Sequence, residues 1–366
     1  MTGVQTCALP ISLTNSFAIG ADMGPAESAK FIKAITGQVL KGGMYKSMQV
    51  AILYQRGDQK SMDNLDEMAK KDPYIKTMKE FVEKGGMVSY LGALSLKSNF
   101  QALHKEIGKN GVLQTKEQLD KFVDIWTDMF ELASRSAAYG IAKQNFMKKG
   151  MTEGAASVRA AAYAKNLANF EQVGELGRAM GAFYMFFRPA ATGAVRAIES
   201  VAPAFRRLES VLEGLPPEIK KDSAALETFK KNYAEKQQHA RIMVTGLIAL
   251  GMLSYYMAAM MSDDDELGRN AVLNDNMQQW TRYARFHIPQ DITRAMGINN
   301  PVVFQIPWGF GLGAFAASGA QIAGAISGKT SVKDALANVF LQISLDSFVP
   351  IPVSKMPPTE IGRAHV

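Results

Sequence analysis

The chain has 366 residues, of which 47% are hydrophobic, with a formal net charge of +7 and a single cysteine. This length predicts two or three domains. One cysteine excludes an internal disulfide framework, and a small charge excess spread along the chain permits contact with nucleic acid or anionic lipid without requiring it.

The two ends of the chain are related to each other as DNA. The chain begins MTGVQTCALPIS and ends IGRAHV. The DNA sequence ACG-TGT-GCT-CTT-CCG-ATC encodes TCALPI, and its reverse complement, read one frame over, encodes IGRAHV. We therefore expect residues 1–12 and 360–366 to be translated sequencing adaptor, which must be set aside before the fold is considered. The cysteine lies in this segment, and the natural protein is expected to extend beyond both ends.

Residues 13–111 are predicted to form a helical N-terminal region of short helices. Glycine and proline punctuate its apolar, helically spaced stretches at Gly42, at the Arg56-Gly57-Asp58 turn, at Asp72-Pro73 and at Gly85-Gly86. Because these residues end helices or begin new ones, we expect breaks at each point. One of the helices between them is expected to begin at Asn64.

A second helical region is predicted over residues 112–214, and its first helix has the clearest start. Thr115 and Gln118 have the spacing of a capping box, in which each side chain bonds a backbone amide of the other residue. An apolar stripe at helical spacing follows: Leu119, Phe122, Val123, Trp126, Phe130 and Ala133. This helix is expected to reach Lys149, with Gly150 ending it.

The rest of this region is expected to contain a break and one further long helix. Arg188-Pro189 should break or kink the helical pattern, because proline lacks the amide hydrogen that a helix interior needs. After Gly193, a helix is predicted to run to about Leu212.

The most distinctive stretch is an uncharged run of twenty residues from Ile242 to Met261. As a helix it would be about 30 Å long, the thickness of a bilayer's hydrocarbon core. Basic residues precede it and acidic residues follow it. Two interpretations stay open: a helix that inserts in a membrane with its basic end in the cytoplasm, and the buried central helix of a soluble all-α core. The candidate membrane-inserting residues are Ile242, Val244, Leu247, Ile248, Leu250 and Leu253.

Beyond this run the pattern changes from helix to strand and back. Residues 282–288 alternate with period two and residues 302–306 are rich in β-formers, which predicts a small β-hairpin. An uncharged helix rich in alanine and glycine is expected next, and it should pack against the 242–261 helix, with the hairpin covering one end of the pair. Small residues let helix backbones approach closely. The candidate packing residues are Gly313, Ala317, Gly319 and Ala323.

The sequence offers few groups for chemistry. His104, His239 and His287 lie far apart, without the spacing of a metal site. The glycines of residues 309–313 lack the spacing of a phosphate-binding loop, and the acidic cluster Asp263–Asp265 completes only half of a calcium-binding loop. We therefore expect no catalytic, cofactor-binding or metal-binding residue.

A set of short sequence blocks stands out between about residues 130 and 352. The blocks are Ala137–Tyr139, Gly150–Ala156, Asn169–Glu175, Phe183–Phe187, Gly193–Arg196, Tyr255-Tyr256, Asp263–Asp265, Trp280, Phe286–Pro289 and Phe304–Leu312. The blocks up to Arg196 resemble a region of large tailed-phage proteins, and those from Tyr255 onward resemble the large polyvalent protein-associated domain 38 family. The resemblance implies a segment of a giant phage or prophage protein that strings modules together, is packaged in the virion or ejected with the genome, and acts in the newly infected cell.

Together these observations predict an all-α, elongated multi-helix assembly with one long apolar helix and a small β-hairpin. A third region, residues 215–352, would hold both features and correspond to the polyvalent-protein-associated domain. The predicted function is that of a non-catalytic module of a phage virion protein that tends to associate with membrane. Its expected partners are other modules of the same chain or other virion proteins. It would be found in the virion and then in the host envelope or cytoplasm. The alternative is a soluble scaffold that links enzyme modules and contacts DNA weakly and nonspecifically.

Overall fold

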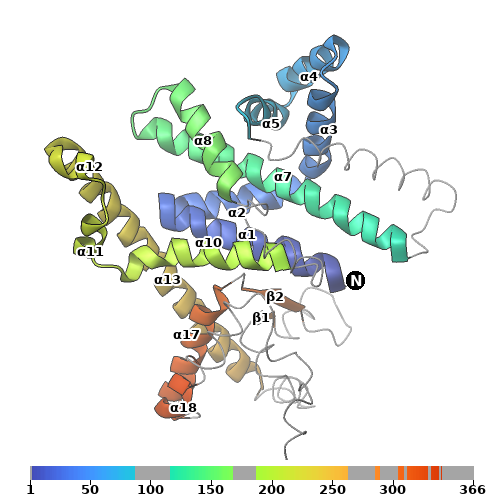
Figure 1. The fold of residues 1–366 in the computed structure, drawn as a ribbon. Helices are drawn as coiled ribbons and strands as arrows, with labels where there is room; N and C mark the ends of the chain where they lie inside the picture. The colour runs from blue at the N-terminus through green and yellow to red at the C-terminus, as the bar shows by residue number, and fades with distance from the viewer. Residues whose placement is uncertain are drawn as a thin grey trace, which may run out of the picture. The chain divides into compact units, whose positions relative to one another are not determined.

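The computed structural model describes residues 2–86, 116–167, 187–262, 285–288, 304–308, 311–328, 331–337 and 339 (Figure 1). This part of the chain is mostly α-helical, as the sequence predicted. Contacts divide the chain into two compact units. The first comprises Met1–Ala8 and Ala18–Phe170, and the second comprises Leu9–Phe17 and Glu171–Val366.

The described part of the first unit is built from α-helices. α1 (Thr2–Met23) contributes residues to both units. The other helices of the first unit are α2 (Pro25–Leu40), α3 (Gly43–Arg56), α4 (Gln59–Lys71), α5 (Pro73–Glu83), α7 (Lys116–Lys148) and α8 (Glu153–Leu167).

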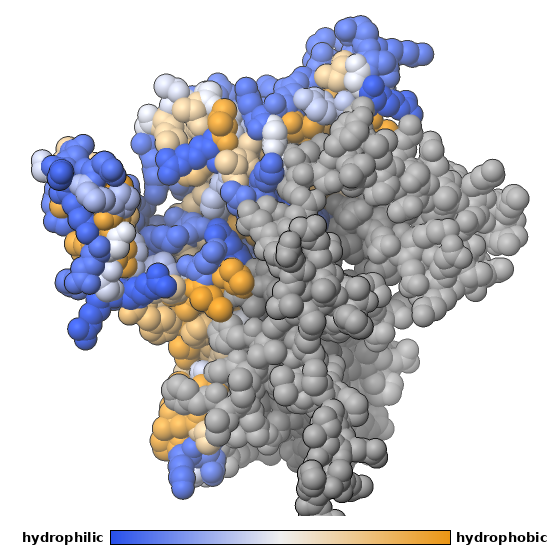
Figure 2. All heavy atoms as spheres, viewed as in Figure 1, coloured by the Kyte–Doolittle hydropathy of each residue, from blue (hydrophilic) through white to orange (hydrophobic). Residues whose placement is uncertain are grey.

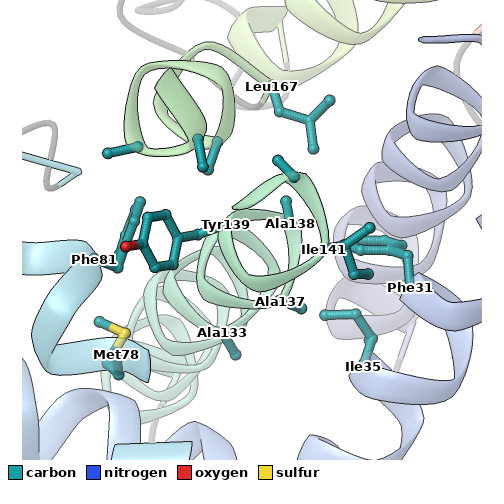
Figure 3. Packing of buried hydrophobic residues seen from close by; sticks show 14 of the residues in the cluster. Phe31, Ile35, Met78, Phe81, Ala133, Ala137, Ala138, Tyr139, Ile141 and Leu167 are labelled. Carbon is teal, nitrogen blue, oxygen red and sulfur yellow. The ribbon is translucent and has the colours of Figure 1, made fainter. Parts of the chain in front are cut away.

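The core of this unit forms around α7 (Figure 3). Small residues on this helix let its neighbours approach it closely, and large side chains from α2 and α5 fill the space on either side. On the α5 side, the rings of Phe81 and Tyr139 lie 5.5 Å apart between centroids. The residues labelled in the figure are Phe31, Ile35, Met78, Phe81, Ala133, Ala137, Ala138, Tyr139, Ile141 and Leu167.

The turns between the short helices follow from local sequence, and the predicted break at residues 56–58 is confirmed. Gly57 adopts φ +64°, a left-handed conformation that suits glycine, and Asp58 then caps α4 by accepting a hydrogen bond from the amide of Ser61 at 2.9 Å. α4 therefore begins five residues before Asn64. Asp72 caps α5 in the same way, with Pro73 as the first helical residue.

The long helix α7 ends where the sequence predicted. It runs to Lys148, and Gly150 follows with φ +89°. Phe130 and Ala133 from the predicted stripe are buried. The capping residue Thr115 and the side chains of residues 116–128 lie outside the described residues, so the capping box and the first part of the stripe stay predictions.

The second unit contains a long helix with shorter helices around it. Its elements are α10 (Phe187–Phe205), α11 (Leu208–Glu213), α12 (Pro217–Lys221), α13 (Ser223–Ser262), β1 (Arg285–Ile288), β2 (Phe304–Pro307), α17 (Gly313–Ile326) and α18 (Val332–Ala337).

The prediction for α10 was wrong at both ends. The described part of the helix starts at Phe187, ahead of Gly193, and it includes Arg188 and Pro189, where a break or kink was predicted. It ends at Phe205 instead of near Leu212. Pro203 lies inside its last turn, and the chain leaves the helical path two residues later.

The two strands pair antiparallel, with Phe286 opposite Ile306 and Ile288 opposite Phe304. The rings of Phe286 and Trp308 form a T-shaped pair with centroids 5.6 Å apart. The residues that join the strands, 289–303, lie outside the described part of the chain, so the hairpin connection stays a prediction.

Candidate functional site

The helix α13 changes character halfway along its outward face. Asp222 caps its start by accepting hydrogen bonds from the amides of Ala224 and Ala225, at 3.0 and 3.1 Å. Up to Arg241 the exposed positions of the helix are mainly charged or polar. From Ile242 onward they are almost entirely apolar or small. The exposed face of α13 therefore changes from polar to apolar between Arg241 and Ile242.

The exposed apolar residues recur at helical spacing and form one stripe. We call this set the outward stripe: Ile242, Gly246, Ala249, Leu250, Leu253 and Tyr256. Ile242, Leu250 and Leu253 remain 46%, 47% and 52% exposed. Of the described residues, only α13, over Ser223–Met257, forms a helix long and apolar enough to cross a membrane. Only 17% of its most apolar eighteen residues are buried. A helix in the centre of a soluble core would be mostly buried.

The opposite side of α13 is packed against α17 through a close backbone contact. A Cβ atom placed on Gly251 would lie 2.9 Å from Cα of Ala316 and closer still to its carbonyl group. A Cβ atom on Gly319 would lie 3.0 Å from the backbone nitrogen of Met252 and closer to the carbonyl of Ile248. The two helices thus touch backbone to backbone, with one glycine contributed by each helix.

The predicted packing residues do not all lie at this contact. Gly319 does, and Ala323 on the same side of α17 is fully buried. Gly313 is also buried, while Ala317 packs beside Ala314 and Val339. The packing residues predicted on α17 did not include Ala316. They are small residues four apart, whereas Ala316 and Gly319 are three apart, a spacing that also places residues on one helix face.

The candidate membrane-inserting residues also fall on different sides of α13. Ile242, Leu250 and Leu253 belong to the outward stripe, whereas Val244 is 5% exposed on the packed side. Leu247 and Ile248 are half-buried. Periodicity identifies the exposed side only after the packed side is known, because the run is apolar all round.

The C-terminal end of α10 is bound to α13 just before the polar half ends. Gln237 donates to the carbonyl oxygens of Pro203 at 3.2 Å and Arg206 at 2.8 Å, and Nε of Arg241 donates to the carbonyl of Ala204 at 3.2 Å. These carbonyls have no amide partner inside their own helix, and a cation near a helix C-terminus is favourable. These hydrogen bonds therefore hold the end of α10 against α13, close to the point where the polar half of α13 gives way to its apolar half.

The first unit holds a separate polar cluster that no sequence motif revealed. Glu80 of α5 accepts hydrogen bonds from Lys143 of α7 at 2.6 Å and Ser157 of α8 at 2.8 Å, and Lys143 also pairs with Glu153 at 2.9 Å. Burial raises the pKa of Glu80, but its hydrogen bonds together with the charge of Lys143 more than offset this effect and hold the pKa below its usual value. The cluster is an ion-pair network that joins three helices. Its members are too far apart in sequence to be associated without the fold.

The structure describes only part of the histidines and acidic residues that the sequence singled out. No three histidine, cysteine, aspartate or glutamate side chains gather in a metal-binding geometry within the residues the structure describes. His104 and the acidic cluster Asp263–Asp265 lie outside those residues, as does the side chain of His287. His239 lies on α13 and is half-buried.

No family model matches the chain, and no curated protein and no solved structure is significantly similar to it.

Proposed function

We propose that the chain is a non-catalytic helical module of a large phage virion-associated protein, and that its second unit associates with membrane through α13. The phage assignment is supported by the sequence blocks that resemble polyvalent phage proteins. Membrane association is supported by the outward stripe of α13. The outward stripe is the observation that carries the proposal, since a helix buried in a soluble core would not leave these apolar side chains exposed.

The physical reason lies in the surface that α13 leaves in water. Moving an apolar side chain fully out of water gains about 1.5–3 kcal/mol, so completing the burial of the half-exposed Ile242, Leu250 and Leu253 would gain about 1 kcal/mol each. The packed side of the helix is already occupied by α17 and by the end of α10. Lipid can bury the apolar side chains on the outward side of α13 without displacing α17 or α10. Amphipathic helices bind bilayer interfaces by the same balance.

Flotation with vesicles of neutral phosphatidylcholine tests this proposal. The full chain should float with the vesicles, and Leu250→Arg should remain in the soluble fraction, because arginine costs about 2.5–3.5 kcal/mol at the centre of an inserted helix. Leu250 is half exposed, so the longer side chain fits in the unbound fold.

A matched control uses the polar half of the same face. Gln238 is exposed one helical repeat before the stripe, and Gln238→Arg adds the same charge where the proposal expects water. This variant should float like the parent chain. Retention of parent and Leu250→Arg in the same fraction, whether soluble or floating, would contradict membrane association through the stripe.

A further inference from the structure

Exposed arginines gather where the outward face of α13 changes from polar to apolar. Arg206 and Arg207 follow the last residue of α10, and both side chains are exposed. The bond from Gln237 to the carbonyl of Arg206 places this pair beside α13, one turn before the exposed Arg241. We call Arg206, Arg207 and Arg241 the arginine group. The arginine group therefore lies at the polar part of α13, just before the stripe begins.

An exposed aromatic residue adjoins this group. Phe205 immediately precedes Arg206 and is 67% exposed, although its ring stacks on Phe315 of α17 with centroids 6.4 Å apart. Figure 2 shows hydrophobic residues gathered over α10 and the α17 region, and mainly hydrophilic residues over α11 and α12. Arginines on a polar surface that adjoins an apolar surface with an exposed phenylalanine are typical of helices that lie in a bilayer interface.

The local backbone does not repel an anion at this position. A helix C-terminus carries partial negative charge, which by itself would disfavour phosphate beside the end of α10. Gln237 and Arg241 already donate to the last carbonyl oxygens of this helix. The exposed guanidinium groups can then bind phosphate oxygens with paired N–H donors.

We propose that the arginine group binds the headgroups of anionic phospholipids, so that the second unit prefers negatively charged membranes and inserts from Ile242 onward. This inference rests on the proposed membrane association and adds the lipid class and the depth of insertion. The apolar stripe and the arginines contribute separately. The stripe supplies burial in any bilayer, whereas the arginines contribute only where the surface is anionic.

Vesicle binding by the full chain separates these two contributions. Partitioning should be measured on phosphatidylcholine vesicles and on vesicles that also contain phosphatidylglycerol. The parent chain should prefer the anionic vesicles, and added salt should reduce this preference. Arg206→Gln combined with Arg207→Gln should weaken binding to anionic vesicles by about 25-fold, or about fivefold for each arginine. Binding to neutral vesicles should not change.

The control removes two charges elsewhere. Lys71 and Lys84 are exposed in the first unit, and replacing both by glutamine lowers the net charge equally. This variant should keep the anionic preference. Equal loss in both double variants would show that total charge acts instead of the arginine group and would overturn the inference.

Other outcomes separate the inference from the proposed function. Equal binding of the parent chain to neutral and anionic vesicles would overturn the inference and leave membrane association standing. Binding to neither vesicle would overturn both. If double-stranded DNA binds the parent chain through Arg206 and Arg207 while vesicle composition has no effect, the arginine group recognises nucleic acid and the lipid assignment is wrong.

Discussion

The contact between α13 and α17 predicts that one substitution will have opposite effects at two glycines of the same helix. Gly246 and Gly251 both lie within the apolar half of α13. A Cβ atom on Gly246 would meet nothing within 4 Å, whereas one on Gly251 would meet the backbone of Ala316. Replacing each glycine by alanine therefore tests whether the two backbones are as close as the structure has them.

The expected magnitudes follow from two competing terms. Alanine favours a helix over glycine by about 1 kcal/mol, so Gly246→Ala should raise the free energy of unfolding by about that amount. At Gly251 the same gain is opposed by overpacking, which costs about 1–3 kcal/mol. The obstructing atoms belong to the backbone of α17 and cannot turn away as a side chain would. Gly251→Ala should therefore lower stability by about 1 kcal/mol, and the two variants should differ by about 2 kcal/mol.

Urea denaturation of the full chain, with amide hydrogen exchange along α13 and α17, measures the difference. Exchange assigns the change to the second unit, because amides of a loosened helix pair lose protection first. Gly319→Ala should match Gly251→Ala, since it strikes the same contact from the other helix. If Gly251→Ala were as stable as Gly246→Ala, the close approach of the two helices would be refuted.

Three further predictions concern the polar cluster and the net charge. Lys143→Met should lower the free energy of unfolding of the first unit by about 1–3 kcal/mol, because it removes a charged hydrogen bond from the half-buried Glu80. As a control, Lys70→Met breaks the exposed ion pair with Glu67 and should leave the denaturation midpoint unchanged. Because hydrogen bonds hold the pKa of Glu80 below its usual 4.5, its contribution to stability is present above that pH and is lost as the pH falls through the lowered pKa. Denaturation midpoints measured against pH should therefore fall in acid, and Glu80→Gln should flatten the fall. The diffuse charge of +7 predicts weak DNA binding that salt abolishes in a gel-shift assay; a sequence-specific complex that survives high salt would contradict this.

The sequence by itself determined the helical class and most of the boundaries set by local chemistry. The turn at Gly57, the start of α5 at Pro73 and the end of α7 before Gly150 depend on the φ preferences of glycine and proline and on caps formed by nearby residues. Such interactions are complete within a few residues, so the printed sequence contains all their partners. The end of α10 at Phe205 is not set by local sequence alone, because its last carbonyl oxygens bind Gln237 and Arg241, more than thirty residues away.

The tertiary structure alone decided which side of the apolar run faces outward. Residues 242–261 are apolar in every direction, so their periodicity cannot distinguish Val244, which is packed, from Leu250, which is exposed. That choice depends on where α17 touches α13, and the contact is set by the paired glycines Gly251 and Gly319. The Glu80 network was hidden for the same reason, because it joins residues that lie far apart in sequence until the helices pack. Packing between distant helices brings such groups together, and local sequence patterns do not predict these contacts.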